Sequence, residues 1–321
     1  MKVLITGGAG FIGSHLTRAL LSAGHTVAVI DDLSTGSLDN ITEFQKDSRY
    51  RFIKGDILVS GELEELIADC DTVFHLAAAV GVELVVHDPV RTILTNVQGT
   101  ERVLTAATKY DKRIILASTS EVYGKSAKPL FAETDDLLIG PSTHSRWSYA
   151  CSKLMDEFLL MAYFRDRGLR GTVVRFFNTV GPGQTGRYGM VIPRFVAAAL
   201  SGAPLKVFGT GEQTRCFCHV SDVVRALLLL METPDSYGGI YNIGSTEKVT
   251  IRQLAEFVIH ELNSSSKIDM IPYDQAYANG FEDMLHRAPD CSKLYALTNW
   301  QAEIPLKQII ADVAESLRKN A

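Results

Sequence analysis

Short apolar runs and longer amphipathic segments alternate along the first 177 residues. The apolar runs have the length of buried strands, and the amphipathic segments repeat apolar residues at helical spacing. The predicted strands are Lys2–Thr6, Thr26–Ile30, Arg51–Lys54, Thr72–Leu76, Arg113–Ala117 and Gly171–Phe177, and the predicted helices are 11–23, 62–68, 89–110 and 146–167. Strands and helices that alternate across short loops predict an α/β fold with a parallel, doubly wound sheet.

The pattern changes after Phe177. A glycine-rich loop at 181–186, a helix at 190–200 and a strand at 205–208 are followed by shorter elements in irregular order. We expect a large domain over 1–177, with about 213–246 packing back on it, and a smaller mixed α/β lobe formed mainly by 178–321. Such a lobe caps the carboxyl edge of the sheet, where ligands of these sheets bind.

Composition excludes several classes of partner. The 321 residues are 46% apolar and 21% charged, and the formal net charge is −5. An acidic protein does not take nucleic acid or an anionic membrane as its main partner. No apolar run reaches the roughly 18 residues of a membrane span, and the first six residues form a strand with no room for a signal peptide, so we expect a cytoplasmic protein.

The five cysteines are scattered, as expected of reduced thiols. Cys216, Cys218 and His219 form a short cluster, but no second ligand pair follows at zinc spacing. We therefore expect no metal site.

Glycines at 7, 10 and 13 lie between the first predicted strand and the first predicted helix. Glycine permits a sharp turn and the close approach of a pyrophosphate, and the helix then offers free N–H groups from Phe11 and Ile12 onward. The order strand, glycine loop, helix is what this mechanism requires. The segment predicts a phosphate-binding loop for a dinucleotide.

The second predicted strand is followed by Asp31, and no Lys or Arg occurs from Asp32 to Glu43. An acid at this point accepts hydrogen bonds from the adenosine ribose and repels a 2′-phosphate, so the cofactor is predicted to be NAD rather than NADP. Asp56 is placed to reach the adenine amino group, although a turn residue explains it equally well. The remaining expected cofactor contacts are Asp32, Ile57, Leu76 and Ala77.

The fifth predicted strand runs into Ser118-Thr-Ser-Glu-Val-Tyr-Gly124, and a later helix carries Tyr149 and Lys153 four residues apart, hence on one face. A tyrosine that acts as a base near pH 7 must lose about 3 units from its usual pKa, or about 4 kcal/mol. A nearby ammonium and a positive nicotinamide ring can supply that. The combination predicts hydride chemistry at an alcohol carbon.

With these residues in view, the chain resembles an extended short-chain dehydrogenase/reductase of the nucleotide-sugar epimerase, dehydratase and decarboxylase group. The matching positions are Gly7, Gly10, Gly13, Asp31, Thr119, Tyr149 and Lys153. The resemblance implies a Rossmann domain, a UDP-sugar substrate held by Asn178, Arg215 and Arg287, and a homodimer formed through the helices near 89–110 and 146–167.

Within this group, the run Thr119-Ser-Glu121 resembles UDP-glucuronate decarboxylases. The resemblance implies that Tyr149 deprotonates the C4 hydroxyl of UDP-glucuronate while Thr119 holds its oxygen. The resulting 4-keto uronate loses CO₂, with Ser120, Glu121 and Arg287 handling the carboxylate and the proton delivered to C5. Two alternatives stay open: 4-epimerisation of UDP-glucose or UDP-glucuronate, favoured by the epimerase-like run Ala77-Ala-Ala-Val-Gly81, and a catalytically silent NAD-binding sensor.

Overall fold

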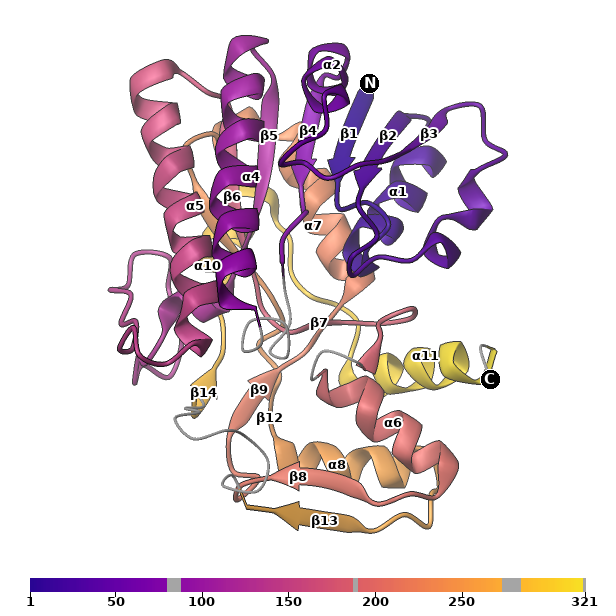
Figure 1. Ribbon diagram of the computed structural model, residues 1–321. Coiled ribbons are helices and arrows are strands. Elements are labelled where there is room, and N and C mark those ends of the chain that lie inside the picture. The colour runs from indigo at the N-terminus through magenta and orange to yellow at the C-terminus, as the bar shows by residue number, and fades with distance from the viewer. Residues whose placement is uncertain (80–87, 187–189, 273–283, 320–321) are drawn as a thin grey trace.

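The computed structural model describes residues 1–79, 88–186, 190–272 and 284–319 (Figure 1). Its main sheet has seven parallel strands in the order β11-β6-β5-β4-β1-β2-β3 within the described chain. The strands are β1 (Lys2–Thr6), β2 (Thr26–Asp31), β3 (Tyr50–Lys54), β4 (Thr72–His75), β5 (Arg113–Thr119), β6 (Gly171–Phe176) and β11 (Ile240–Ile243). The predicted doubly wound α/β sheet is confirmed.

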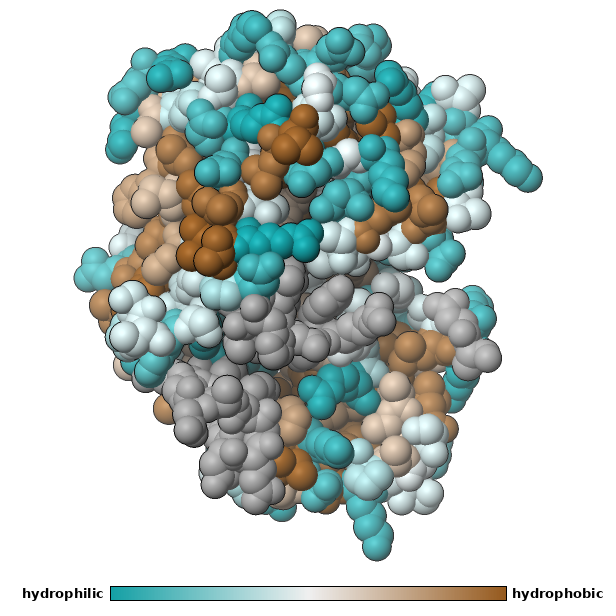
Figure 2. All heavy atoms as spheres, in the orientation of Figure 1, coloured by the Kyte–Doolittle hydropathy of each residue, from teal (hydrophilic) through white to brown (hydrophobic). Residues whose placement is uncertain are grey.

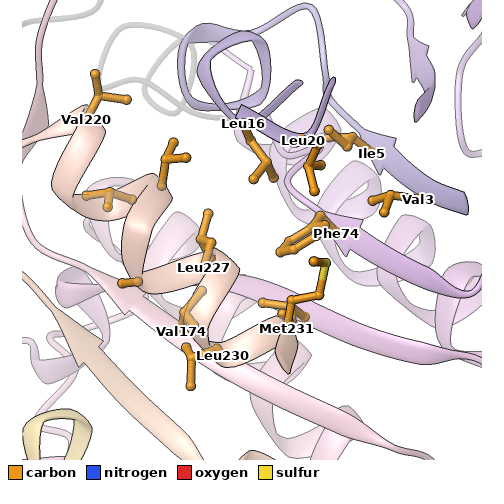
Figure 3. Packing of buried hydrophobic residues seen from close by; sticks show 14 of the residues in the cluster. Val3, Ile5, Leu16, Leu20, Phe74, Val174, Val220, Leu227, Leu230 and Met231 are labelled. Carbon is orange, nitrogen blue, oxygen red and sulfur yellow. The ribbon is translucent and has the colours of Figure 1, made fainter. Parts of the chain in front are cut away.

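Helices cover both faces of this sheet. One face carries α2 (Glu62–Asp69), α4 (Pro89–Lys109) and α5 (Arg146–Arg167), and the other carries α1 (Phe11–Ser22) and α7 (Val220–Glu232) (Figure 1). Because successive strand side chains point to opposite faces, a strand covered on both faces must be apolar throughout. In β1, Val3 and Ile5 accordingly pack with α1 and α7 (Figure 3), whereas Leu4 packs with α2 and α4.

The last strand of the sheet comes from the second half of the chain. β11 pairs in parallel with β6, from Ile240 beside Val173 to Ile243 beside Phe176. The helix α7 precedes β11, and its Leu227 and Leu230 lie in the same apolar cluster as Leu16 of α1 (Figure 3). Both elements fall within 213–246; the domain boundaries themselves stay a prediction.

A second cluster of elements lies below the carboxyl edge of the large sheet (Figure 1). Helices α6 (Val191–Ser201), α8 (Ile251–Glu261) and α11 (Leu306–Lys319) share an apolar core with β8 (Leu205–Phe208), which pairs with β13 (Ile268–Ile271). The strand β9 (Thr214–Cys216) lies between β12 (Lys248–Thr250) and β14 (His286–Arg287), and β7 (Thr179–Val180) pairs with β10 (Cys218–His219). Another short helix, α10 (Ser292–Thr298), packs against β11.

Candidate active site

A cavity of about 1120 Å³ opens at the carboxyl ends of the parallel strands. This volume exceeds the roughly 300–1,000 Å³ of a pocket for one small ligand. Every predicted site residue lines it: Gly7, Gly10, Phe11, Ile12, Gly13, Asp31, Asp32, Asp56, Ile57, Leu76, Ala77, Thr119, Ser120, Glu121, Tyr149, Lys153, Asn178, Arg215 and Arg287. The structure thus brings together residues that the sequence separates by up to 280 positions.

The glycine loop leaves no room for side chains. Gly7 has a φ of +74°, and a Cβ there would lie 2.7 Å from the backbone nitrogen of Ala77. A Cβ on Gly13 would lie 2.4 Å from the carbonyl oxygen of Gly7. The helix α1 begins directly after Gly10, which has no side chain to accept the N–H groups of the first turn. The cavity wall is therefore bare backbone at a helix N-terminus, which fits a dinucleotide's pyrophosphate.

Asp31 lies at the end of β2 and holds the glycine loop in place. Its Oδ2 accepts the N–H of Ala9 at 3.0 Å, and its Oδ1 accepts the N–H of Leu33 at 2.8 Å. Burial raises the pKa of Asp31, while these two backbone bonds lower it. Each carboxylate oxygen can accept a second hydrogen bond, so the same side chain is available to ribose hydroxyls.

The neighbouring acids are also engaged by the chain. Asp32 accepts the N–H of Ser34 at 2.8 Å, and its other oxygen lies 3.9 Å from Arg91 of α4. Arg91 is a cation near the predicted ribose site. The local sequence around Asp31 does not reveal it, and its charge faces Asp32. Asp56 accepts the N–H of Leu58 at 2.8 Å, as expected of a turn residue, while it also lines the cavity. Its adenine contact stays a prediction.

Tyr149 lines the cavity and is partly buried. Burial raises the pKa of its hydroxyl, and the Glu121 charge raises it further, whereas a hydrogen bond with Thr119 and the charge of Arg287 lower it. The predicted partner Lys153 lies on the same helix, only 2% exposed, with its ammonium 2.7 Å from Oδ2 of Asp156. The net effect is a raised pKa for Tyr149, the opposite of the expected lowering. Its lowering by Lys153 and the nicotinamide ring together stays a prediction for the protein with NAD bound.

Glu121 lies in η3 (Ser120–Tyr123), the short turn after β5, between two arginines. Arg287 of β14 donates from Nη1 to Oε1 of Glu121 at 3.1 Å and from Nη2 to Oδ1 of Asn178 at 3.0 Å. Arg146, at the start of α5, has its Nη2 4.0 Å from the same Glu121 oxygen. The cluster places three charged groups beside Tyr149.

Arg215 is the register partner of Arg287, because β9 and β14 pair in parallel. Its Nη1 donates to the carbonyl oxygens of Thr214 at 2.9 Å and Met284 at 2.8 Å, and its side chain lines the cavity. Two neighbouring guanidinium groups favour a dianionic ligand such as a diphosphate.

A small apolar cluster fixes these charged groups. Tyr123 of η3 stacks on Phe131 with ring centroids 4.8 Å apart, and Trp147 and Phe177 are buried in the same cluster. Arg146 lies over the Trp147 ring at 5.6 Å. Because η3, α5 and the end of β6 all contribute to this cluster, Glu121, Tyr149 and Asn178 are held by one packed unit.

Several residues of the site were missed by sequence reasoning. Arg146 is three residues before Tyr149, a helical spacing that places both on one face and provides a usable signal. Asn96 of α4 does not itself line the cavity but supports its wall: it donates to Ser152 of α5 at 2.9 Å and accepts the N–H of Ala79, a lining residue, at 2.8 Å. Only the tertiary fold reveals these contacts. The epimerase-like run ends in Val80 and Gly81, which lie outside the described residues.

Metal binding and membrane insertion are two further functions to consider for the described residues. No group of three or more His, Cys, Asp or Glu in this part of the chain is arranged to hold a metal ion. None of the helices in the same residues is long and apolar enough to cross a membrane.

The glycine loop, the acid at the end of β2 and the tyrosine that lines the same cavity define a dinucleotide-dependent enzyme. Residues 3–244 match the NAD dependent epimerase/dehydratase family. The chain belongs to this family, so the inferred resemblance and the NAD cofactor are confirmed.

Individual relatives span the whole chain. A UDP-N-acetyl-alpha-D-glucosaminuronate decarboxylase of Bacillus cytotoxicus is 41% identical over 319 residues, covering 99% of this chain and 98% of that protein. UDP-glucuronic acid decarboxylase 5 of Arabidopsis thaliana is 36% identical and covers 99% of this chain and 89% of its own. The structure of UDP-glucuronic acid 4-epimerase from Bacillus cereus, in complex with UDP-glucuronic acid and NAD, matches at a TM-score of 0.89 with 29% identity over 100% of both chains.

Proposed function

We propose that the protein is an NAD-dependent decarboxylase of a UDP-hexuronate, with UDP-glucuronate as the leading substrate. The observation that carries this proposal is the cluster of Glu121, Arg287 and Arg146 beside Tyr149, in the cavity that the glycine loop also lines. The named decarboxylases among the relatives support the same reaction.

The first step is oxidation at C4 of the sugar. Tyr149 accepts the proton of the C4 hydroxyl, and Thr119, which hydrogen-bonds to Tyr149, holds the same oxygen. Bound NAD⁺ supplies the hydride acceptor for C4. A ketone at C4 is β to the C6 carboxylate, so oxidation itself activates the sugar for loss of CO₂.

The second step is governed by the charged cluster. Two arginines and one glutamate carry a local net charge of +1, which a substrate carboxylate would balance. The carboxylate leaves water for a less polar enclosure. As the C5–C6 bond breaks, neutral CO₂ departs and the charge spreads over the enolate formed at C5, C4 and the C4 oxygen, which is then favourable. Glu121 raises the energy of the charged ground state or relays the proton that C5 receives, with Ser120 and Arg287 in supporting positions.

The nucleotide half of the substrate needs cations and amide donors. Arg215 and Asn178 line the part of the cavity formed by β9 and the segment after β6. We assign the UDP diphosphate to this part, with Arg287 between it and the sugar carboxylate.

The substituent at C2 of the sugar is the main substrate question. The Bacillus cytotoxicus relative is named for a substrate with an N-acetyl group, and the Arabidopsis relative for one without it. UDP-N-acetylglucosaminuronate is therefore the second candidate substrate for the same reaction.

Two other functions remain as alternatives. In a 4-epimerase the 4-keto sugar rotates and the hydride returns to its other face; the Bacillus cereus 4-epimerase structure favours this candidate. A catalytically silent NAD-binding sensor is disfavoured because Tyr149 and Lys153 both line the cavity.

We also propose a homodimer formed through α4 and α5 and a cytoplasmic location. Apolar side chains gather over these two helices on the surface (Figure 2). Among them, Val90 is 66% exposed, Phe158 60% and Met155 49%. An exposed apolar patch of this kind marks an interaction surface, and pairing two copies would bury it.

The proposed cytoplasmic location rests on the five free cysteines, because free thiols are typical of a reducing compartment.

The proposed reaction is tested by incubating the purified protein with NAD⁺ and, separately, UDP-glucuronate, UDP-N-acetylglucosaminuronate and UDP-glucose. Products are followed by NMR, with Tyr149→Phe as the inactive control. A UDP-pentose, with or without a 2-acetamido group, supports the proposal and identifies the substrate. A six-carbon product inverted at C4 supports the epimerase instead.

A further inference from the structure

Lys153 and Asp156 form an ion pair inside the large domain. Their side chains are 3% and 0% exposed, and Nζ of Lys153 donates to Oδ2 of Asp156 at 2.7 Å. They are three residues apart on α5, one turn beyond Tyr149. A buried ammonium without a hydrogen-bond partner is strongly unfavourable, so the acceptor that Asp156 provides holds the Lys153 side chain in place at this depth.

A row of buried polar groups lies next to the pair. The hydroxyl of Thr100 of α4 lies 3.1 Å from Nε2 of His75. Nδ1 of His75 lies 2.7 Å from the hydroxyl of Thr6, which accepts the N–H of Ala77 at 3.3 Å. The row therefore runs from Thr100 to the backbone that faces Gly7 in the glycine loop.

The histidine of this row is neutral, because complete burial lowers the pKa of His75 to about 3. One of its ring nitrogens therefore donates a hydrogen bond and the other accepts one. The hydroxyls of Thr6 and Thr100 can take either role, so both nitrogens of the buried ring have a partner.

We propose that Asp156 is a positioning residue that fixes the ammonium of Lys153 on α5, one turn beyond Tyr149 and next to the buried row of Thr100, His75 and Thr6 that reaches the glycine loop. The three hydrogens of the ammonium are divided: one binds Asp156, and the others remain for the cofactor ribose and the tyrosine oxygen. The inference rests on the proposed function only in taking Tyr149 as the proton acceptor.

The pair also sets the charge that Tyr149 experiences. The charged groups facing this region are Glu121 of η3, Arg287 of β14, and Arg146, Lys153 and Asp156 of α5, with Glu157 paired to Arg175 of β6 behind them. The negative charge of Asp156 raises the pKa of Tyr149 and offsets the lysine. Removing that charge without removing the hydrogen bond should make Tyr149 more acidic.

The test uses Asp156→Asn, which keeps the size and an oxygen acceptor, and Asp156→Leu, which removes every hydrogen bond. Asp166→Asn is the matched control, because it makes the same charge change at an exposed position of α5. Ionisation of Tyr149 is followed with NAD⁺ bound, as the ultraviolet difference between each protein and the same protein carrying Tyr149→Phe. The affinity for NAD⁺ is measured by titration calorimetry.

We expect Asp156→Asn to move the Tyr149 midpoint down by about one pH unit, given a separation near two helical turns. Asp156→Leu should weaken NAD⁺ binding about tenfold or more, and Asp166→Asn should change neither quantity. A midpoint in Asp156→Asn equal to that of the unmodified protein overturns the inference, even if the Leu variant fails to fold. Neither measurement depends on the sugar substrate, so a missing decarboxylase activity would contradict the proposed function alone.

Discussion

Nη1 of Arg287 lies 3.1 Å from Oε1 of Glu121, although 166 residues separate them. The contact joins the turn after β5 of the large sheet to β14 of the smaller one. Its position beside Tyr149 places a carboxylate and a guanidinium in the cavity, where C4 oxidation alone would need only the tyrosine.

Glu121→Gln is expected to reduce CO₂ release from the hexuronate by roughly a hundredfold or more, the scale of a lost acid–base group. Epimerisation at C4 needs no acid at this position, so any UDP-glucose 4-epimerase activity should fall much less. Both rates are measured on the same preparation, together with its melting curve. Equal loss of both activities with a lower melting temperature would instead assign Glu121 to holding the loop.

Asp31→Ala is expected to weaken NAD⁺ binding about tenfold, because it removes the charged hydrogen bonds to the ribose. Its preference for NAD⁺ over NADP⁺ should narrow, because the repulsion of a 2′-phosphate is removed. Fluorescence titration with both cofactors measures this, with Asp69→Ala as an exposed control. An unchanged ratio of the two affinities would show that another group selects the cofactor.

Stability should depend on pH through His75. Its pKa is lowered from the usual 6.5 to about 3 by burial, so below pH 6.5 the unfolded chain takes up a proton that the folded protein refuses. As the pH falls from 7.5 to 5, the free energy of unfolding should therefore decrease by about 2 kcal/mol.

The check for this effect is urea unfolding of the protein and of His75→Asn at both pH values. At pH 7.5 the variant is expected to be less stable than the unmodified protein, because it interrupts the buried hydrogen bonds. Between pH 7.5 and 5, however, its free energy of unfolding should fall by about 2 kcal/mol less than that of the unmodified protein. Identical losses would mean that the histidine titrates normally.

Phe158→Glu should disrupt the proposed homodimer, since it places a charge in the apolar patch on α5. Val59→Glu is the control, because Val59 is 79% exposed and lies outside α4 and α5. Sedimentation at micromolar concentration should show a species of twice 35.2 kDa for the unmodified protein and the control, and a single chain for Phe158→Glu. A monomer in all three samples would contradict the proposed homodimer.

The strands and helices of the large domain could be predicted because the spacing of apolar residues and the residues that form turns depend only on neighbouring positions in the sequence. The glycine loop and Asp31 were recognisable for the same reason, since the consecutive elements β1, loop, α1 and β2 contain them. Asp156 was not recognised, because its spacing from Lys153 is also typical of an exposed helix surface. Only the packing of α4 against α5 and β4 reveals that the pair is buried near Thr100 and His75. The contact between Arg91 and Asp32 likewise depends on tertiary structure.

The central claim is tested most directly with UDP-glucuronate that carries deuterium at C4, incubated with the protein and NAD⁺. Decarboxylation through a 4-keto intermediate predicts release of CO₂ together with either a UDP-pentose that has regained the deuterium at C4, or a UDP-4-keto-pentose with the deuterium on the nicotinamide. A UDP-hexuronate inverted at C4 that retains all six carbons would contradict it, as would unchanged substrate with a protein shown to bind NAD⁺.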